Sequence, residues 1–227
     1  ERYGRTWKNS IRWAGFGIPV KTELETLVKD ALMLTELGEL TKEDGYFYAK
    51  KNKWTGQKED IKRQIADHSV KTVSFDIFDT LILRPFLEPA DLFRLLDIRF
   101  KEIEDASLTD FAAIRAEAER TVRKKLYDTQ LEEVTLTDIY EQIQKEYGIS
   151  ADTADRLMQE EKKLEVRFCY QRKLGYELFC MAKQLQKEIV LASDMYLDSS
   201  CIEAILNKNG YAGYSRLFLS SECQMTK

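Results

Sequence analysis

The chain has 227 residues, of which 35 are lysine or arginine and 39 are aspartate or glutamate, and its formal net charge is −4. This charge argues against a nucleic-acid-binding surface. No apolar stretch reaches the roughly 18 residues of a membrane helix and no secretory signal is visible, so we expect a cytoplasmic protein of one or two domains.

Residues 1–68 have a helical pattern and a composition of their own. Apolar residues recur at helical spacing after Pro19 and Thr22, either of which can start a helix. Upstream, basic residues alternate with aromatic ones, and the group could bind nucleic acid or anionic lipid: Arg5, Trp7, Lys8, Arg12, Trp13 and Phe16. We favour an amphipathic helix docked on a neighbouring domain. Because the first residue is Glu1 rather than Met, we interpret residues 1–68 as a helical extension or linker to an upstream domain.

The run Val-Ser-Phe-Asp-Ile-Phe-Asp-Thr-Leu at 73–81 has the composition of a strand buried on both faces of a parallel sheet. The strand ends at Asp76, and Thr80 follows four residues later. Open α/β sheets bind ligands at this end of their strands. A charge there is costly unless it meets a metal, a substrate or several hydrogen bonds. The alternative is an aspartate that only caps the next turn.

The region 84–172 is predicted to be helical. Arg84-Pro85 and Glu88-Pro89 interrupt the chain after the first strand, and no proline occurs downstream. Amphipathic stretches with three- and four-residue spacing follow, as in a small bundle, and Thr135 and Thr137 are candidate helix caps.

Charged residues in this region have two interpretations. Arg115, Glu119 and Arg123 have the spacing of ion pairs along one helix face, which we expect to be exposed. Alternatively, an arginine of the region contacts a substrate, and the candidates are Arg84, Arg115 and Arg167.

Two further apolar runs follow the helical region. The run at 188–195 reaches Ser193, and the run at 216–222 closes with hydroxyls and is soon followed by Lys227. Parallel strands need a crossover, which the helical region can supply. The strand ends would then gather an aspartate, hydroxyls and a lysine at one crevice. Such a set could bind a phosphoryl group, because the aspartate can attack or hold a metal and the lysine can neutralise charge.

The four cysteines, at positions 169, 180, 201 and 223, are widely spaced and show no metal-ligand pattern. We interpret them as free, partly buried thiols in a reducing cytosol. With His68 as the one histidine, the sequence disfavours a zinc site and a histidine-based triad.

Three motifs in order resemble those of the haloacid dehalogenase (HAD) superfamily, over roughly residues 70–227. Phe75–Leu81 resembles the first motif, an aspartate with a threonine four residues on. Residues 189–193 resemble the second motif, a strand ending in serine or threonine, and Lys227 resembles the lysine that follows the third strand. Together with Ser-Asp-Met-Tyr-Leu at 193–197, the first motif is also similar to the HAD-like domains attached to bacterial glycosyltransferases.

The resemblance implies an α/β fold with a Rossmann-like parallel sheet. Residues 69–83 and 173–227 would form the HAD core, and 84–172 a helical cap that closes over the crevice, screens water and selects the substrate. The helical extension 1–68 would precede them. The core would be truncated, because the family's fourth motif, an acidic pair that completes a magnesium site, would lie beyond the end of the sequence.

The resemblance also implies a Mg²⁺-dependent phosphohydrolase that acts on a small phosphorylated metabolite. Asp76 would be the nucleophile that forms an aspartyl-phosphate, and it would bind the metal together with the backbone carbonyl of Phe78. Thr80 and Ser193 would bind the phosphate, and Lys227 would steady the nucleophile and the developing charge. The expected partners are this substrate and an upstream glycosyltransferase domain.

One departure from the family bears on catalysis. Phe78 stands where the phosphatases have a second aspartate, which acts as the general acid and base. A phenyl ring cannot transfer a proton, so the rate acceleration of about 10²–10⁴-fold that acid–base catalysis supplies is lost at this position. Asp79 would point to the opposite face if the chain were still extended there. Two alternative functions follow. One is a haloacid-dehalogenase-type hydrolase, which also lacks the second aspartate and needs no metal. The other is a non-catalytic HAD-like interaction module.

The strand at 73–75 is expected to have an open edge, because the superfamily's neighbouring strand carries the fourth motif. An unpaired apolar edge invites pairing with another chain. We predict that the edge is covered by the N-terminal extension, by a second copy of the chain in a homo-oligomer, or by residues outside the sequence. We also predict that Asp76 lacks a complete magnesium shell.

Overall fold

The computed structural model describes residues 38–43, 46–51, 53–86, 89–103, 110–126 and 133–226. The chain divides into two compact units, and each is described by itself. Unit 1 is built from Glu1–Pro89, Cys169–Leu191 and Asn209–Arg216. Unit 2 is built from Ala90–Phe168, Ala192–Lys208 and Leu217–Lys227.

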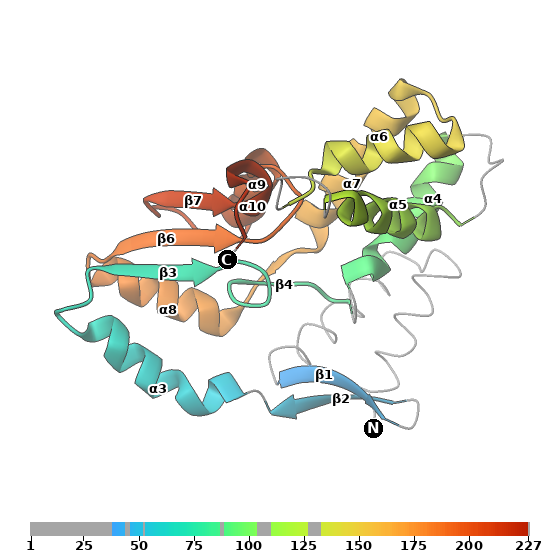
Figure 1. The fold of residues 1–227 in the computed structure, drawn as a ribbon. Coiled ribbons are helices and arrows are strands. Elements are labelled where there is room, and N and C mark those ends of the chain that lie inside the picture. Colours follow the sequence, from blue (N-terminus) through green and yellow to red (C-terminus); the bar gives the residue numbers. More distant parts are fainter. Residues whose placement is uncertain are drawn as a thin grey trace. The chain divides into compact units, whose positions relative to one another are not determined.

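A parallel three-stranded sheet carries the strands predicted from the sequence. Its order is β3 (Thr72–Asp76), β6 (Glu188–Ser193) and β7 (Arg216–Leu219) (Figure 1). Backbone bonds also join the segments at the start of the sheet, since the N–H of Glu188 donates to Lys71 O at 2.9 Å. The predicted α/β class and the parallel sheet are therefore confirmed.

The sequence predicted a helical region before β3, but part of this region forms a β-hairpin. Strands β1 (Gly38–Glu43) and β2 (Tyr46–Lys51) form an antiparallel hairpin, and helix α3 (Lys53–Ala66) follows. Two sequence signals for the hairpin were missed, namely the Asp-Gly dipeptide at 44–45 and the aromatic residues of β2. The aromatic and basic group at residues 5–16 and the apolar pattern around residues 24–34 lie outside the described residues.

Unit 1 has an aromatic core between β3 and α8 (Lys173–Gln184). The ring of Phe179 lies 5.9 Å from that of Phe75 and 5.1 Å from that of Tyr211, with the second pair edge to face. The Tyr211 hydroxyl donates to Leu81 O at 2.6 Å, which ties this core to the turn after β3. A short antiparallel ladder of β4 (Ile82–Leu83) with β5 (Tyr170–Gln171) lies next along the chain.

Unit 2 contains helices that the three- and four-residue spacing predicted within residues 84–172, and further helices after that region that this spacing did not predict. A 3₁₀ turn, η1 (Pro89–Leu92), leads into the helices α4 (Phe93–Ile103), α5 (Phe111–Leu126), α6 (Leu136–Tyr147), α7 (Ala151–Phe168), α9 (Ser199–Lys208) and α10 (Ser220–Cys223). Thr135 caps α6 in a reciprocal capping box with Asp138, as predicted, whereas Thr137 is an exposed residue within the helix.

Arg115 contradicts the expected exposed face of α5, because its side chain has no exposed surface. Its guanidinium lies between two rings, 4.4 Å from the centre of Phe93 and 4.9 Å from that of Tyr196. Two hydrogen bonds, of 2.8 and 2.7 Å, join it to Glu161 of α7. Spacing alone did not distinguish an exposed ion-pair row from a buried one.

Neighbouring groups extend this buried ion pair. The Tyr140 hydroxyl of α6 donates to Glu161 at 2.8 Å, and Glu119 accepts from both Arg115 at 3.0 Å and Arg123 at 2.9 Å. Burial, followed by the charge of Glu161, raises the pKa of Tyr140 well above its ordinary value, so Tyr140 stays a donor. The network therefore joins α5, α6 and α7 at the centre of unit 2.

Candidate functional site

The candidate nucleophile and the threonine four residues later come together at the end of β3. Asp76 is the last residue of the strand, and the Thr80 hydroxyl donates to its carboxylate at 2.9 Å. The chain turns sharply between them, because Ile77 O accepts from the N–H groups of Leu81 at 2.8 Å and Ile82 at 2.9 Å. The sequence motif is thus a strand followed by a tight turn that directs a hydroxyl back to the carboxylate.

Asp79 lies in this turn rather than in extended chain, which corrects the expectation for its backbone. Its φ is 58°, in the left-handed region that aspartate tolerates better than most residues. Its N–H donates to Ile82 O at 2.8 Å, and its carbonyl accepts a bond from the Arg172 side chain. The rule that successive side chains of a strand point to opposite faces therefore does not apply to Asp79.

Gly175 of α8 allows the turn to lie directly on the helix, a role that sequence reasoning missed. A Cβ atom at this position would lie 2.2 Å from Thr80 O and 3.1 Å from Leu81 Cα. No real Cβ atom tolerates the shorter distance, so a larger side chain would displace the turn that carries Thr80. A glycine near the start of a helix otherwise looks unremarkable in a sequence.

The three arginines suggested for substrate contact have different surroundings. The Arg84 guanidinium lies 4.2 Å above the Phe78 ring, next to the motif in unit 1. Arg167 lies 5.5 Å from the ring of Phe168. Arg115 is buried in its ion pair, so the structure contradicts a contact between this residue and a substrate.

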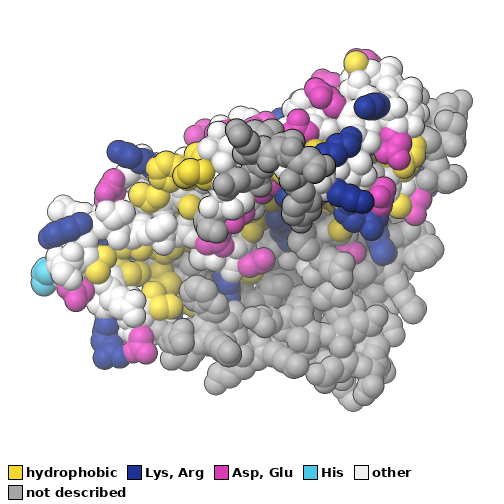
Figure 2. Space-filling view, viewed as in Figure 1, with side chains coloured by type: hydrophobic (Ala, Val, Ile, Leu, Met, Phe, Trp, Pro, Cys, Tyr) yellow, Lys and Arg dark blue, Asp and Glu magenta, His cyan; other side chains and the backbone are white. Residues whose placement is uncertain are grey.

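A cavity of about 620 Å³ runs along β3 in unit 1. Residues of α3, β3 and α8 line it. Half of the lining residues have apolar side chains, and Asp76, Thr80 and Arg172 are among the polar ones. Figure 2 shows hydrophobic side chains gathered in the area over β3 and α8. Among the described residues β3 pairs with β6 alone, so β3 is an edge strand in this part of the chain. Helix α3, from the predicted N-terminal extension, supplies one wall of the cavity.

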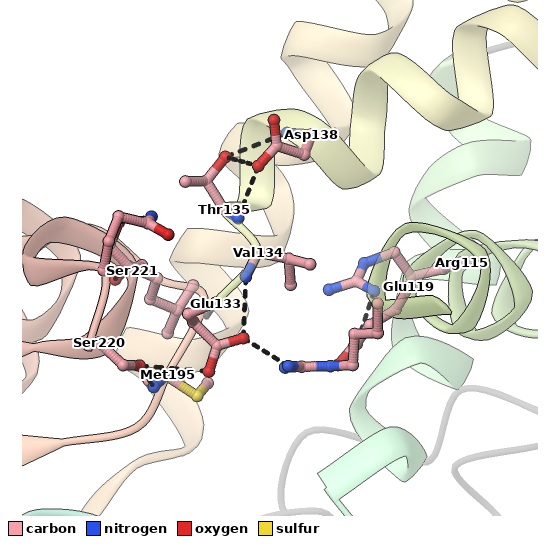
Figure 3. A network of polar contacts seen from close by, with 12 residues as sticks. Arg115, Glu119, Glu133, Val134, Thr135, Asp138, Met195, Ser220 and Ser221 are labelled. Atoms are coloured by element: carbon pink, nitrogen blue, oxygen red, sulfur yellow. Dashed lines mark hydrogen bonds and ion pairs between the residues drawn. The ribbon is translucent and has the colours of Figure 1, made fainter. Parts of the chain in front are cut away.

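Ser193 ends β6 and is buried, with 3% of its surface exposed. The chain leaves this strand through Met195, whose N–H donates to the Ser220 hydroxyl at 2.9 Å. Ser220 in turn donates to Glu133 at 3.2 Å, and Figure 3 shows Glu133 pointing toward Ser220 with Met195 beside it. Sequence reasoning did not select these residues. Lys227 lies outside the described residues.

The donors at the end of β3 fit a magnesium ion in type. Magnesium prefers oxygen ligands and is often held by one or two carboxylates, with waters and substrate phosphates completing its shell. Asp76 and the carbonyl of Phe78 are such oxygens. Within the described parts of the chain, no group of three or more histidine, cysteine, aspartate or glutamate residues could hold a metal.

The remaining predictions concern the thiols and the membrane. All four cysteines are free, as expected, and Cys169 and Cys201 are buried. Burial, followed by the charges of Glu165 and Asp198, raises the pKa of Cys201 to about 12, so this thiol is unreactive near neutrality. None of the helices in the described ranges has the length and hydrophobicity to cross a membrane.

Comparison with protein-family models found no match, and comparison with curated proteins found no significant similarity.

Proposed function

We propose that the chain carries an HAD-type phosphohydrolase site in which Asp76 attacks a small phosphorylated metabolite. The observation that carries this proposal is the bond from the Thr80 hydroxyl to the Asp76 carboxylate, at 2.9 Å, at the carboxyl end of a parallel strand. The motif resemblance supplies the rest, including the Rossmann-like core, the helical cap and the roles of Ser193 and Lys227.

The proposed chemistry has two steps. A carboxylate oxygen of Asp76 forms a bond to phosphorus while the ester P–O bond breaks, and water then cleaves the aspartyl-phosphate to release inorganic phosphate. Ser193 donates to a phosphate oxygen, and Lys227 neutralises developing charge. A magnesium ion, held by Asp76 and the Phe78 carbonyl, would supply further charge neutralisation. The proton for the departing oxygen comes from Asp79 or from water, because Phe78 has none to give.

The alternative of haloacid hydrolysis is favoured by Phe78. Displacement of a halide by a carboxylate needs no proton donor for the leaving group, so an apolar ring at this position costs that reaction nothing. Both reactions use Asp76 as the nucleophile. They differ in the substrate and in the need for a metal.

The test compares Asp76→Asn with Asp79→Asn in a chain that includes the family's fourth motif, using an aryl phosphate with Mg²⁺ and a haloacid without it. We expect magnesium-dependent phosphate release that Asp76→Asn abolishes. Retention of activity in Asp76→Asn with its loss in Asp79→Asn would show that the motif register is wrong. Turnover of the haloacid alone would establish the dehalogenase, and turnover of neither substrate would favour the non-catalytic module.

A second variant tests the missing acid. Phe78→Asp should raise phosphate release by about 10²-fold or more if general acid catalysis is restored. The new carboxylate would lie under the Arg84 guanidinium, which favours its ionised form and weakens it as an acid. The experiment therefore includes Phe78→Asp with Arg84→Gln. If neither variant gains activity while both remain folded, Asp79 or water already fills the role.

A further inference from the structure

A buried chain of hydrogen bonds in unit 2 fixes the backbone that follows β6 (Figure 3). The Glu133 side chain is 5% exposed and accepts from three donors. These are the Arg123 side chain, the N–H of Val134 at 2.9 Å and the Ser220 hydroxyl at 3.2 Å. Ser220 then accepts from the N–H of Met195 at 2.9 Å. The Ser220 hydroxyl thus links the Glu133 carboxylate to the backbone N–H of Met195.

The order of donors in this chain follows from the charge of Glu133. An ionised carboxylate only accepts, so the one Ser220 proton must point toward Glu133. That leaves the lone pairs of the Ser220 oxygen for the N–H of Met195. A hydroxyl without this neighbour could rotate and offer its proton elsewhere. Glu133 therefore sets the orientation in which Ser220 receives the backbone.

We propose that Glu133 and Ser220 are positioning residues that hold the end of β6 in the geometry with which Ser193 binds phosphate. Met195 lies two residues beyond Ser193, so fixing its N–H restricts the path of the chain directly after that serine. This inference rests on the proposed function for the role of Ser193. It adds two residues, distant in sequence, that contact no substrate in this role.

The adjacent serine offers a matched control. Ser221 is also buried, at 6% exposure, but its hydroxyl donates to Leu197 O at 3.2 Å and not to Glu133. The substitutions Ser220→Ala and Ser221→Ala remove the same atom from neighbouring buried positions. A merely structural loss of a buried hydroxyl would affect both variants alike.

The first experiment measures amide hydrogen exchange in the full chain. Ser220→Ala should speed exchange at Met195 about tenfold, which corresponds to about 1.4 kcal/mol. The amide of Ile202 in α9, bonded to Asp198 O at 3.1 Å, reports on the stability of the helix that follows. Its exchange should not change. Glu133→Gln keeps the shape of the side chain but presents an NH₂ group toward Ser220 or Arg123. Exchange at Met195 should therefore speed up in this variant too, but by less than in Ser220→Ala. Ser220→Thr keeps the hydroxyl, so the Met195 amide should exchange as slowly as in the wild type.

The second experiment measures binding of inorganic phosphate in the presence of Mg²⁺ by calorimetry. We expect the Kd to rise about fivefold in Ser220→Ala and to stay unchanged in Ser221→Ala and Ser220→Thr. Faster exchange at Met195 with an unchanged Kd would overturn the positioning role, as would equal effects of Ser220→Ala and Ser221→Ala. If the wild-type protein bound no phosphate, the proposed function would fail and the positioning of Ser193 with it, while the exchange data would still judge the Glu133–Ser220 contact separately.

Discussion

Replacing Arg115 with methionine removes one partner of a fully buried ion pair, and the structure gives the size of the expected loss. Neither Arg115 nor Glu161 has exposed side-chain surface, and two hydrogen bonds of 2.7 and 2.8 Å join them. Removal of one partner leaves an uncompensated buried charge, which typically costs about 3–5 kcal/mol. Arg115→Met keeps an apolar stem between the rings of Phe93 and Tyr196, so the cost arises mainly from Glu161.

A matched control lies on the same helix. Arg120 is 73% exposed and pairs with Glu117, which is 49% exposed, so Arg120→Met should cost less than about 0.5 kcal/mol. The double variant Arg115→Met with Glu161→Gln removes both charges but leaves an acceptor for the Tyr140 hydroxyl. It should recover at least half of the lost stability, because replacement of a whole buried pair is often nearly neutral.

Urea unfolding followed by circular dichroism gives the free energy of unfolding, and amide exchange in α5 and α7 assigns any change to unit 2. We expect the free energy of unfolding to be highest, and about equal, in the wild type and Arg120→Met, lower in the double variant, and lowest in Arg115→Met. If Arg115→Met lay within about 1 kcal/mol of the wild type, the buried pair would not stabilise the helices as argued. A double variant as unstable as the single one would show that packing, not charge, dominates the loss.

Three further predictions concern unit 1 and the thiols. Gly175→Ala should lower the free energy of unfolding in urea, because the new Cβ atom would lie 2.2 Å from Thr80 O. Such overpacking costs about 1–3 kcal/mol, which outweighs the roughly 1 kcal/mol gained from alanine's helix propensity. A variant as stable as the wild type would contradict this. Hydrogen bonds from two lysines of α3 lower the pKa of Glu177 from 4.5 to about 2. Since a lowered folded-state pKa stabilises above the unfolded value, the Tm difference between wild type and Glu177→Gln should be full above about pH 4.5 and shrink as the pH falls toward 2; a difference independent of pH would refute it. In thiol labelling at pH 8, exposed Cys223 should react fastest and buried Cys201 only after unfolding, and prompt labelling of Cys201 would be inconsistent with its burial.

Local pattern in the sequence determined the elements on which the candidate site is built. A strand that ends in Asp76, with Thr80 four residues later, could be predicted because strand composition and the following turn are both local properties. The helices within residues 84–172 followed from their apolar spacing, and the cap at Thr135 followed from a residue type beside the helix start. The hairpin at 38–51 could have been predicted as well, since its Asp-Gly signal is equally local.

Only the tertiary structure decided which side chains are buried and which groups meet across the sequence. The spacing of Arg115 fits an exposed helix face as well as a buried one, and its burial depends on Phe93, Tyr196 and Glu161 from other segments. Gly175 matters because of one carbonyl in a turn far earlier in the chain. The contact of Glu133 with Ser220 joins residues 87 positions apart. Periodicity reports the face of one element, whereas these contacts depend on how several elements pack, and no short stretch of sequence contains that information.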